Sequence, residues 1–150
     1  MPDPSGRPTP VDPTRSAGAE GRPIRLMCVD DSVDVIRMLR IAIAREPGLN
    51  WVGHLNSADR LVDEAAIHQP DVVLLDLTMP GRDPLAAVAE LAATMPGVRV
   101  LAFSGFDDAD RLDAVVKAGA WGLISKHCST AEIVAAIRQV ASGGLVVPAH

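Results

Sequence analysis

The chain has 150 residues, 48% of them hydrophobic and 22% charged, which is the size and composition of one globular domain with an apolar core. Its formal net charge is −5 without a run of lysines or arginines, so binding to a nucleic-acid backbone or to an anionic membrane is disfavoured. Cys28 and Cys128 fit neither a disulfide framework nor a zinc spacing. We expect a cytoplasmic protein, because the chain has no signal peptide and no apolar run long enough to cross a bilayer.

Composition divides the chain into three parts. Residues 1–23 hold six of the twelve prolines and few hydrophobic residues, so we expect a disordered tail there. Residues 24–142 carry the periodic apolar pattern of a folded domain. Residues 143–150 begin with a glycine pair, and we expect them to form a C-terminal tail or a truncated linker.

Five short apolar runs alternate with segments of helical periodicity, and each run predicts a strand. The runs are residues 24–29, 50–55, 71–75, 98–103 and 121–125. Helical spacing over residues 33–46 favours a helix after the first run, and start signals favour one after each of the others. Ser57 and Asp83 are predicted N-caps, Asp107 begins another helix, and Ser129 with Glu132 forms a capping-box pattern. Five strands, each followed by a helix, predict an α/β fold with an open, doubly wound, five-stranded parallel sheet.

Polar residues stand at the ends of the predicted strands and could form one site. Asp30, Asp31, Asp76, Ser104 and Lys126 follow or end four of the strands, and ligand sites of doubly wound sheets form at that edge. Three neighbouring carboxylates repel unless a divalent cation or a protonated carboxyl offsets their charge, and oxygen ligands favour Mg²⁺. The chain has two lysines against twelve arginines, and the compact ammonium of Lys126 suits a phosphoryl or carboxylate oxygen.

Four motifs in this order resemble a known family. They are Val-Asp30-Asp31-Ser, Leu-Leu-Asp76-Leu-Thr-Met-Pro-Gly81, Ala-Phe-Ser104-Gly, and Lys-Ala-Gly-Ala-Trp-Gly-Leu-Ile-Ser-Lys126. Over about residues 24–142 the chain resembles the receiver domain of bacterial two-component response regulators. The resemblance implies a flavodoxin-like (βα)5 fold with strand order 2-1-3-4-5.

The resemblance also implies the roles of the acidic residues. Asp76 is the expected phosphoacceptor, which takes a phosphoryl group from a histidine kinase or a histidine phosphotransfer protein. Asp30, Asp31 and Asp76, with the backbone carbonyl of Thr78, are the expected ligands of Mg²⁺. Such chemistry needs an oxygen nucleophile, a cation on the phosphoryl oxygens and neutralised charge.

Two further residues complete the implied site. Ser104, through its hydroxyl, and Lys126, through its ammonium group, are expected to bind the phosphoryl oxygens. The resemblance implies a signalling switch rather than an enzyme, with Mg²⁺-dependent autophosphorylation and autodephosphorylation as its intrinsic activities.

The expected partners beyond the phosphodonor are proteins. By family analogy, a downstream protein or a second copy of the chain would bind the face formed by the fourth helix, the fifth strand and the fifth helix. Residues 141–150 resemble the start of the linker in regulators that carry a C-terminal helix-turn-helix domain. Because an output domain of that type would need about 60 further residues, a single-domain regulator is favoured over the receiver half of a transcription factor.

Two other classes remain as alternatives. Leu123 stands where the family usually has an aromatic residue that reports phosphorylation, which leaves open a phosphorylation-independent pseudo-receiver. A small phosphatase of the haloacid-dehalogenase type also uses an aspartate nucleophile on a doubly wound sheet. That class usually has a second aspartate two residues after the nucleophile, where this chain has Thr78, so we favour it least.

Overall fold

The computed structural model describes residues 21–105 and 109–148, within which five strands and five helices alternate. The strands are β1 (Ile24–Val29), β2 (Leu49–Leu55), β3 (Val72–Asp76), β4 (Arg99–Ser104) and β5 (Leu123–Ser125). The helices are α1 (Val33–Ala44), α2 (Leu61–His68), α3 (Pro84–Thr94), α4 (Ala109–Ala118) and α5 (Thr130–Ala141). In this part of the chain no helix is long and apolar enough to cross a membrane.

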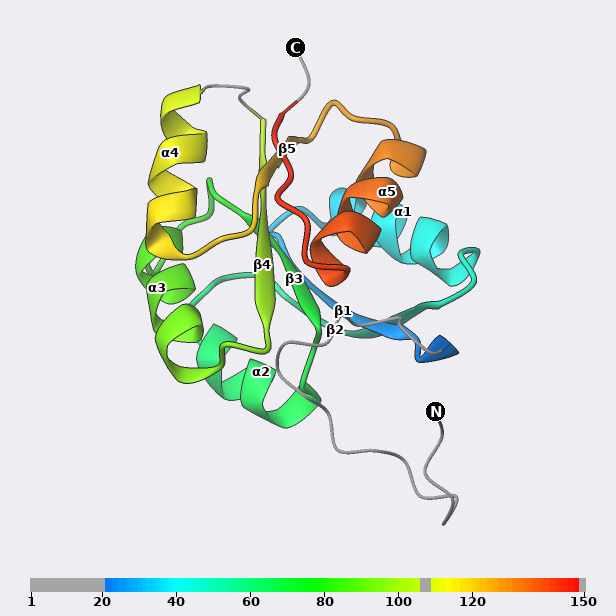
Figure 1. The fold of residues 1–150 in the computed structure, drawn as a ribbon, viewed down its shortest axis with the longest axis horizontal. Coiled ribbons are helices and arrows are strands. Elements are labelled where there is room, and N and C mark those ends of the chain that lie inside the picture. The colour runs from blue at the N-terminus through cyan, green and yellow to red at the C-terminus, as the bar shows by residue number, and fades with distance from the viewer. Residues whose placement is uncertain (1–20, 106–108, 149–150) are drawn as a thin grey trace.

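The strands form one parallel sheet in the order β2-β1-β3-β4-β5, as Figure 1 shows. This confirms the predicted fold class and strand order. The chain leaves β1 for β2 on one side and returns to β3 on the other, so the strand order reverses at β1. The crevice beyond the carboxyl ends of β1 and β3 is therefore the expected place for a ligand.

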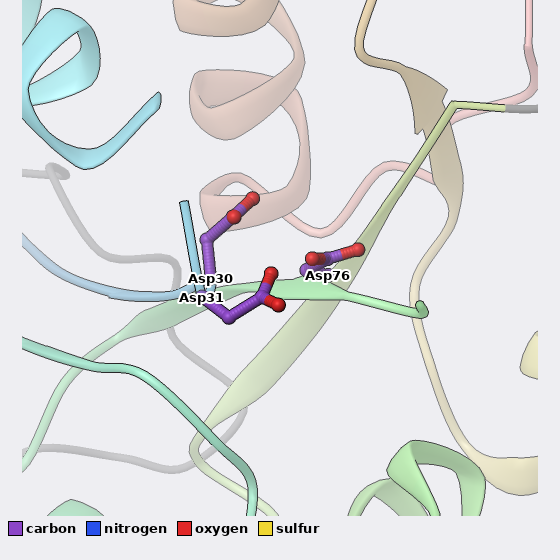
Figure 2. A group of neighbouring side chains, drawn as sticks. All are labelled: Asp30, Asp31 and Asp76. Atoms are coloured by element: carbon purple, nitrogen blue, oxygen red, sulfur yellow. The ribbon is translucent and has the colours of Figure 1, made fainter. Parts of the chain in front are cut away.

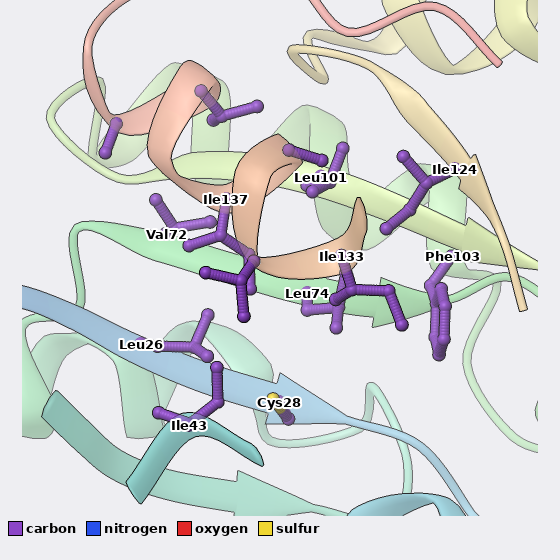
Figure 3. Close-up of a cluster of buried hydrophobic side chains, with 14 of the residues drawn as sticks. Leu26, Cys28, Ile43, Val72, Leu74, Leu101, Phe103, Ile124, Ile133 and Ile137 are labelled. Atoms are coloured by element: carbon purple, nitrogen blue, oxygen red, sulfur yellow. The ribbon is translucent and has the colours of Figure 1, made fainter. Parts of the chain in front are cut away.

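Helices cover both faces of the sheet and enclose two hydrophobic clusters. Helices α1 and α5 lie on one face, and α2, α3 and α4 lie on the other (Figure 1). The cluster under α1 and α5 includes Leu74, Ile133 and Ile137 (Figure 3), and the opposite cluster includes Leu75 and Leu91. Because both faces of β3 are buried, its residues form a continuous apolar run, as central parallel strands do.

The predicted helix starts differ in outcome. Asp83 caps α3 by accepting a hydrogen bond from the Leu85 backbone N–H, and Ser129 forms the complete capping box of α5; both predictions are confirmed. The prediction for Ser57 is wrong: α2 begins after Arg60, without a side-chain cap. The Ser57 hydroxyl instead accepts a hydrogen bond from the Asp59 backbone N–H in the preceding turn. Asp107, the predicted start of the fourth helix, lies outside the described residues.

The chain after α5 turns back along β5. Val146 donates a backbone hydrogen bond to Trp121 and accepts one from Leu123, at N···O distances of 2.9 and 3.2 Å, and forms a parallel bridge with Gly122. Its side chain is 6% exposed and belongs to the cluster under α1 and α5. Residue 146 thus extends the sheet by one short contact beyond β5.

Candidate functional site

Three carboxylates meet at the carboxyl ends of β1 and β3. Val29, the last residue of β1, is aligned with Leu75 of β3, so the residues that come after them, Asp30 and Asp76, are neighbours. Asp31 comes next in the chain. One carboxylate oxygen from each of the three lies within 4.8 Å of the others, and Figure 2 shows the three side chains together.

Burial raises the electrostatic energy of this carboxylate cluster. Asp76 is 1% exposed and Asp30 is 3% exposed, while Asp31 is exposed. Like charges in a site of low dielectric constant raise each other's energy strongly, and burial adds a desolvation penalty. The folded chain must therefore hold a positive charge against them.

Lys126 supplies that charge from the residue after β5. Its Nζ lies 2.8 Å from Oδ2 of Asp30 and 3.2 Å from Oδ2 of Asp76. Burial alone would lower the pKa of Lys126 and is the largest single influence on it. The contacts with Asp30 and Asp76 together outweigh burial and raise the pKa of Lys126 above its ordinary value. The ammonium form is thus favoured, and it is shared between two carboxylates.

Backbone and hydroxyl donors fix the other oxygen of each buried carboxylate. Oδ1 of Asp30 accepts a hydrogen bond from the Ser32 N–H at 2.9 Å. Oδ1 of Asp76 accepts two hydrogen bonds from Thr78, from the backbone N–H and from Oγ1, both at 3.0 Å. Each carboxylate is consequently held in one orientation, with Oδ2 turned toward Lys126 and the rest of the cluster.

The cluster fits a hard divalent cation. Oδ2 of Asp30 and Oδ2 of Asp76 are buried and have no hydrogen-bond partner among the described residues, although both lie within ion-pair distance of Lys126. Three carboxylates and one ammonium group leave a formal excess of two negative charges. Closely spaced carboxylate oxygens with lone pairs to spare and excess negative charge are the donor set that Mg²⁺ or Ca²⁺ binds.

Ser104 is the last residue of β4 and lies at the same edge of the sheet. Its side chain is fully buried, and its carbonyl oxygen accepts a hydrogen bond from the Lys126 backbone N–H at 2.7 Å. The end of β4 and the start of the β5–α5 loop are thereby tied together. The Lys126 ammonium also lies 5.5 Å from the centre of the Phe103 ring.

Two contacts of the site were not expected from the sequence. Thr78 was expected to bind the cation through its backbone carbonyl, and its N–H and its hydroxyl are also found to hold Asp76. Arg111 of α4 places Nη1 3.5 Å from Oγ of Ser104. A hydroxyl residue two positions after a strand-ending aspartate is a recognisable sequence signal, whereas nothing local marks Arg111.

Two of the three carboxylates, those of Asp30 and Asp31, border an open hollow of about 360 Å³. The hollow is also lined by residues of α1, of the end of β2 and of the loop after it, including Val33, His54 and Asn56. Asp30 and Asp31 can therefore be approached from the side of α1.

Comparison with known proteins agrees with this geometry. The model of the family described as response regulator receiver domain matches residues 26–138. The chain belongs to this family. Its receiver domain carries three acidic residues and a lysine at the strand ends, where the fold places a ligand site.

Relatives of this receiver domain are longer proteins of different kinds. Response regulator GacA of Pseudomonas viridiflava is 35% identical over 121 residues, which cover 80% of this chain and 56% of the relative. Protein-glutamate methylesterase/protein-glutamine glutaminase 3 of Myxococcus xanthus is 35% identical over 108 residues, which cover 70% of this chain and 30% of the relative. The chain therefore spans about half or less of the length of these relatives.

A solved structure of similar size supports the same assignment. The signal receiver domain of the response regulator NarL from Mycobacterium tuberculosis superimposes with a TM-score of 0.76 at 28% sequence identity, covering 81% of this chain and 98% of that one. The receiver domain accordingly has the fold of an isolated domain that has been solved separately.

Proposed function

We propose that this receiver domain is a phosphorylatable switch. Asp76 accepts a phosphoryl group from a histidine kinase or a histidine phosphotransfer protein, and the phosphorylated domain regulates a partner protein. The observation that carries the proposal is the pair of buried carboxylates, Asp30 and Asp76, that share the ammonium group of Lys126. A buried charge cluster of this kind is costly to fold and is typical of functional sites.

The residues around Asp76 suit transfer of a phosphoryl group. The O–P bond to a carboxylate oxygen of Asp76 forms as the P–N bond of the phosphohistidine breaks. Thr78 holds the carboxylate through two hydrogen bonds to Oδ1, so the nucleophile is positioned before the donor arrives. Asp30, Asp31 and Asp76, with the Thr78 carbonyl, would hold Mg²⁺, which neutralises charge on the phosphoryl oxygens.

Ser104 and Lys126 would bind the transferred group. The Lys126 ammonium already lies 3.2 Å from Asp76 Oδ2, within reach of an oxygen on a phosphorylated Asp76. The Ser104 hydroxyl would donate to a second phosphoryl oxygen. Because the Ser104 carbonyl and the Lys126 N–H are hydrogen-bonded to each other, movement of one residue toward the phosphoryl group is transmitted to the other.

The proposal extends to partners and location. The domain would work in the cytoplasm, receive its phosphoryl group at Asp76, and pass the signal on through protein contacts. The face of α4, β5 and α5 is the surface we propose for the downstream partner or for a second copy of the chain. Autodephosphorylation at Asp76 would end the signal.

The deciding experiment is intact-mass analysis after incubation with acetyl phosphate, with and without Mg²⁺. We expect the mass of one phosphoryl group to be gained only with Mg²⁺, and to be absent in Asp76→Asn. Asp113→Asn is the matched control, because the same change is made at an exposed acid of α4, and it should take up one group normally.

Two results would count against the proposal. Undiminished uptake by Asp76→Asn would place the acceptor at another residue. No uptake by the folded, Mg²⁺-binding parent chain, from acetyl phosphate or from a phosphorylated kinase, would favour a phosphorylation-independent interaction module.

A further inference from the structure

A second cation contacts the site from α4. Nη1 of Arg111 lies 3.5 Å from the hydroxyl oxygen of Ser104. Ser104 is the last residue of β4 and is fully buried, whereas Arg111 belongs to the first turn of α4 and is partly buried. The contact therefore joins the end of the sheet to a helix on its surface.

We propose that Arg111 is a positioning residue for Ser104, which couples α4 to the phosphoryl group on Asp76. This inference rests on the proposed function, because it gives Arg111 a role only when a phosphoryl group is bound. Arg111 would act by holding the Ser104 hydroxyl in the orientation that donates to a phosphoryl oxygen.

Hydrogen-bonding chemistry sets the direction of this contact. A guanidinium group has only donors, so the Ser104 oxygen must be the acceptor. A serine hydroxyl has two lone pairs and one proton, and a lone pair used by Arg111 leaves the proton for a different acceptor. Because a serine hydroxyl otherwise rotates to suit its surroundings, a fixed acceptor bond reduces the entropy lost when the proton meets a phosphoryl oxygen.

Charge gives the contact a second consequence. The three carboxylates and Lys126 carry a formal excess of two negative charges, and Lys126 is already shared by Asp30 and Asp76. Phosphorylation of Asp76 adds further negative charge at neutral pH. A hydroxyl that accepts a hydrogen bond from a guanidinium group is polarised and donates more strongly, so the Ser104 proton would interact more strongly with that added charge.

Because residue 123 is a leucine, a connection from the phosphoryl site to α4 through another residue gains importance. Leu123 is 1% exposed and packs in the same cluster as Val115 of α4. An aliphatic side chain has no hydroxyl group and no ring with which to follow a movement of Ser104. The hydrogen bond from Arg111 to Ser104 connects the phosphoryl site to α4 without passing through residue 123.

The test measures binding of beryllofluoride, an analogue of the phosphoryl group, to the full chain in the presence of Mg²⁺. Arg111→Gln removes the charge and should weaken beryllofluoride binding about tenfold, the size of one hydrogen bond to a charged group. Lys117→Gln is the matched control, since it removes the same charge from an exposed position on the same helix, and it should bind as the parent chain does.

A double-mutant cycle separates positioning from a structural role. In the Ser104→Ala background, Arg111→Gln should weaken binding less than twofold, because the residue through which Arg111 acts is gone. Arg111→Lys keeps the charge without the planar group, and we expect an intermediate loss. It also serves as the second variant if Arg111→Gln unfolds.

The outcomes distinguish this inference from the proposed function. Binding by Arg111→Gln equal to that of the parent chain overturns the role of Arg111 and leaves phosphorylation at Asp76 intact. An equal loss in both backgrounds also overturns it, because Arg111 would then act independently of Ser104. A parent chain that binds no beryllofluoride and takes up no phosphoryl group overturns both.

Discussion

Lys126 is the residue on which the electrostatics of the site depend. Its ammonium group contacts two buried carboxylates, and its raised pKa means that folding favours the protonated form. The stabilisation is present at neutral pH, and it is lost as the pH rises above the ordinary lysine value of 10.5 and through the higher folded-state pKa.

Replacement of this lysine should destabilise the domain and increase its response to a cation. Without Mg²⁺ at pH 7, Lys126→Met is expected to lower the free energy of unfolding by about 3 kcal/mol, because two buried carboxylates lose their counter-charge. Mg²⁺ should then raise the Tm of the variant more than that of the parent chain. Urea unfolding and Tm measurements with and without Mg²⁺ test both expectations.

The control for this prediction is Lys117→Met. Lys117 pairs with Asp113 on the surface of α4, and both side chains are largely exposed, so the loss should not exceed about 0.5 kcal/mol. Equal stability of the two variants, or equal Mg²⁺ responses of Lys126→Met and the parent chain, would contradict the assigned role of Lys126.

The two cysteines should differ sharply in reactivity. Both are free, but Cys28 is buried in β1 whereas Cys128 is partly exposed. Burial, with a smaller effect of the Asp30 charge, raises the pKa of the Cys28 thiol, which disfavours the reactive thiolate. A thiol reagent at pH 8 should modify only Cys128 in the folded chain and both residues in urea.

The Cys28 thiol should lower the stability of the domain at high pH. Above the ordinary thiol pKa of 9.0, the unfolded chain loses the Cys28 proton and the folded chain keeps it, so this thiol makes stability fall as the pH rises. Rapid modification of Cys28 in the folded chain at pH 8, measured by mass, would show that β1 opens readily.

At the scale of elements, the site depends on how strand ends are aligned. Asp76 of β3 is paired with Phe103 of β4, and Ser104 is paired with Ser125 of β5. These pairings bring the residues of the site to the same edge of the sheet, with Ser104 one residue and Lys126 two residues beyond the level of Asp76. A shift of register by one residue would turn the site side chains to the opposite face of the sheet.

The contact of Val146 with β5 should depend on the glycine at position 122. A β-carbon at Gly122 would lie 2.3 Å from the Val146 carbonyl oxygen, so Gly122→Ala must displace the chain after α5. We expect a loss of about 1–3 kcal/mol in the free energy of unfolding. Hydrogen exchange should also show lost protection of the Leu123 and Val146 amides.

The matched control is Gly97→Ala. Among the described residues other than its two chain neighbours, a β-carbon there meets no heavy atom within 4 Å, so the free energy of unfolding should change by no more than about 0.5 kcal/mol. If Gly122→Ala behaved in the same way, residue 146 would not be held against β5 in solution.

At the scale of the whole molecule, one sheet is shared by two hydrophobic clusters. Leu74 and Leu75 are adjacent in β3, are fully buried, and point into opposite clusters. Trp51 and Trp121 both pack against the cluster that contains Leu74. A cooperative domain must lose both clusters together, because neither keeps its shape without the sheet.

This arrangement predicts the behaviour of two alanine variants. Leu74→Ala and Leu75→Ala should each lower the free energy of unfolding by about 2–5 kcal/mol. Each should shift the urea midpoint equally by tryptophan fluorescence and by far-UV circular dichroism. A tryptophan transition unmoved by Leu75→Ala, with a split dichroism curve, would show that the two faces unfold separately.

Much of this structure could be predicted because the sequence patterns that indicate it are local. Alternating apolar runs and helical segments imposed a doubly wound sheet, and the acidic residues at strand ends marked its ligand edge. The start signals at Asp83 and Ser129 were also confirmed, since a helix cap involves neighbours no more than three residues apart. The prediction for Ser57 was wrong because its hydroxyl accepts an equally local hydrogen bond, from the Asp59 N–H in the turn before the helix.

Only the tertiary structure decided which distant groups meet. The sequence by itself determined the element order, the parallel sheet and the residues at the strand ends, because periodicity and chain order suffice for these. The sharing of Lys126 between two carboxylates, the contact of Arg111 with Ser104, and the pairing of Val146 beside β5 join segments far apart or folded back on one another. Such contacts depend on strand register and helix packing, which are set by the assembled core rather than by any one stretch of residues.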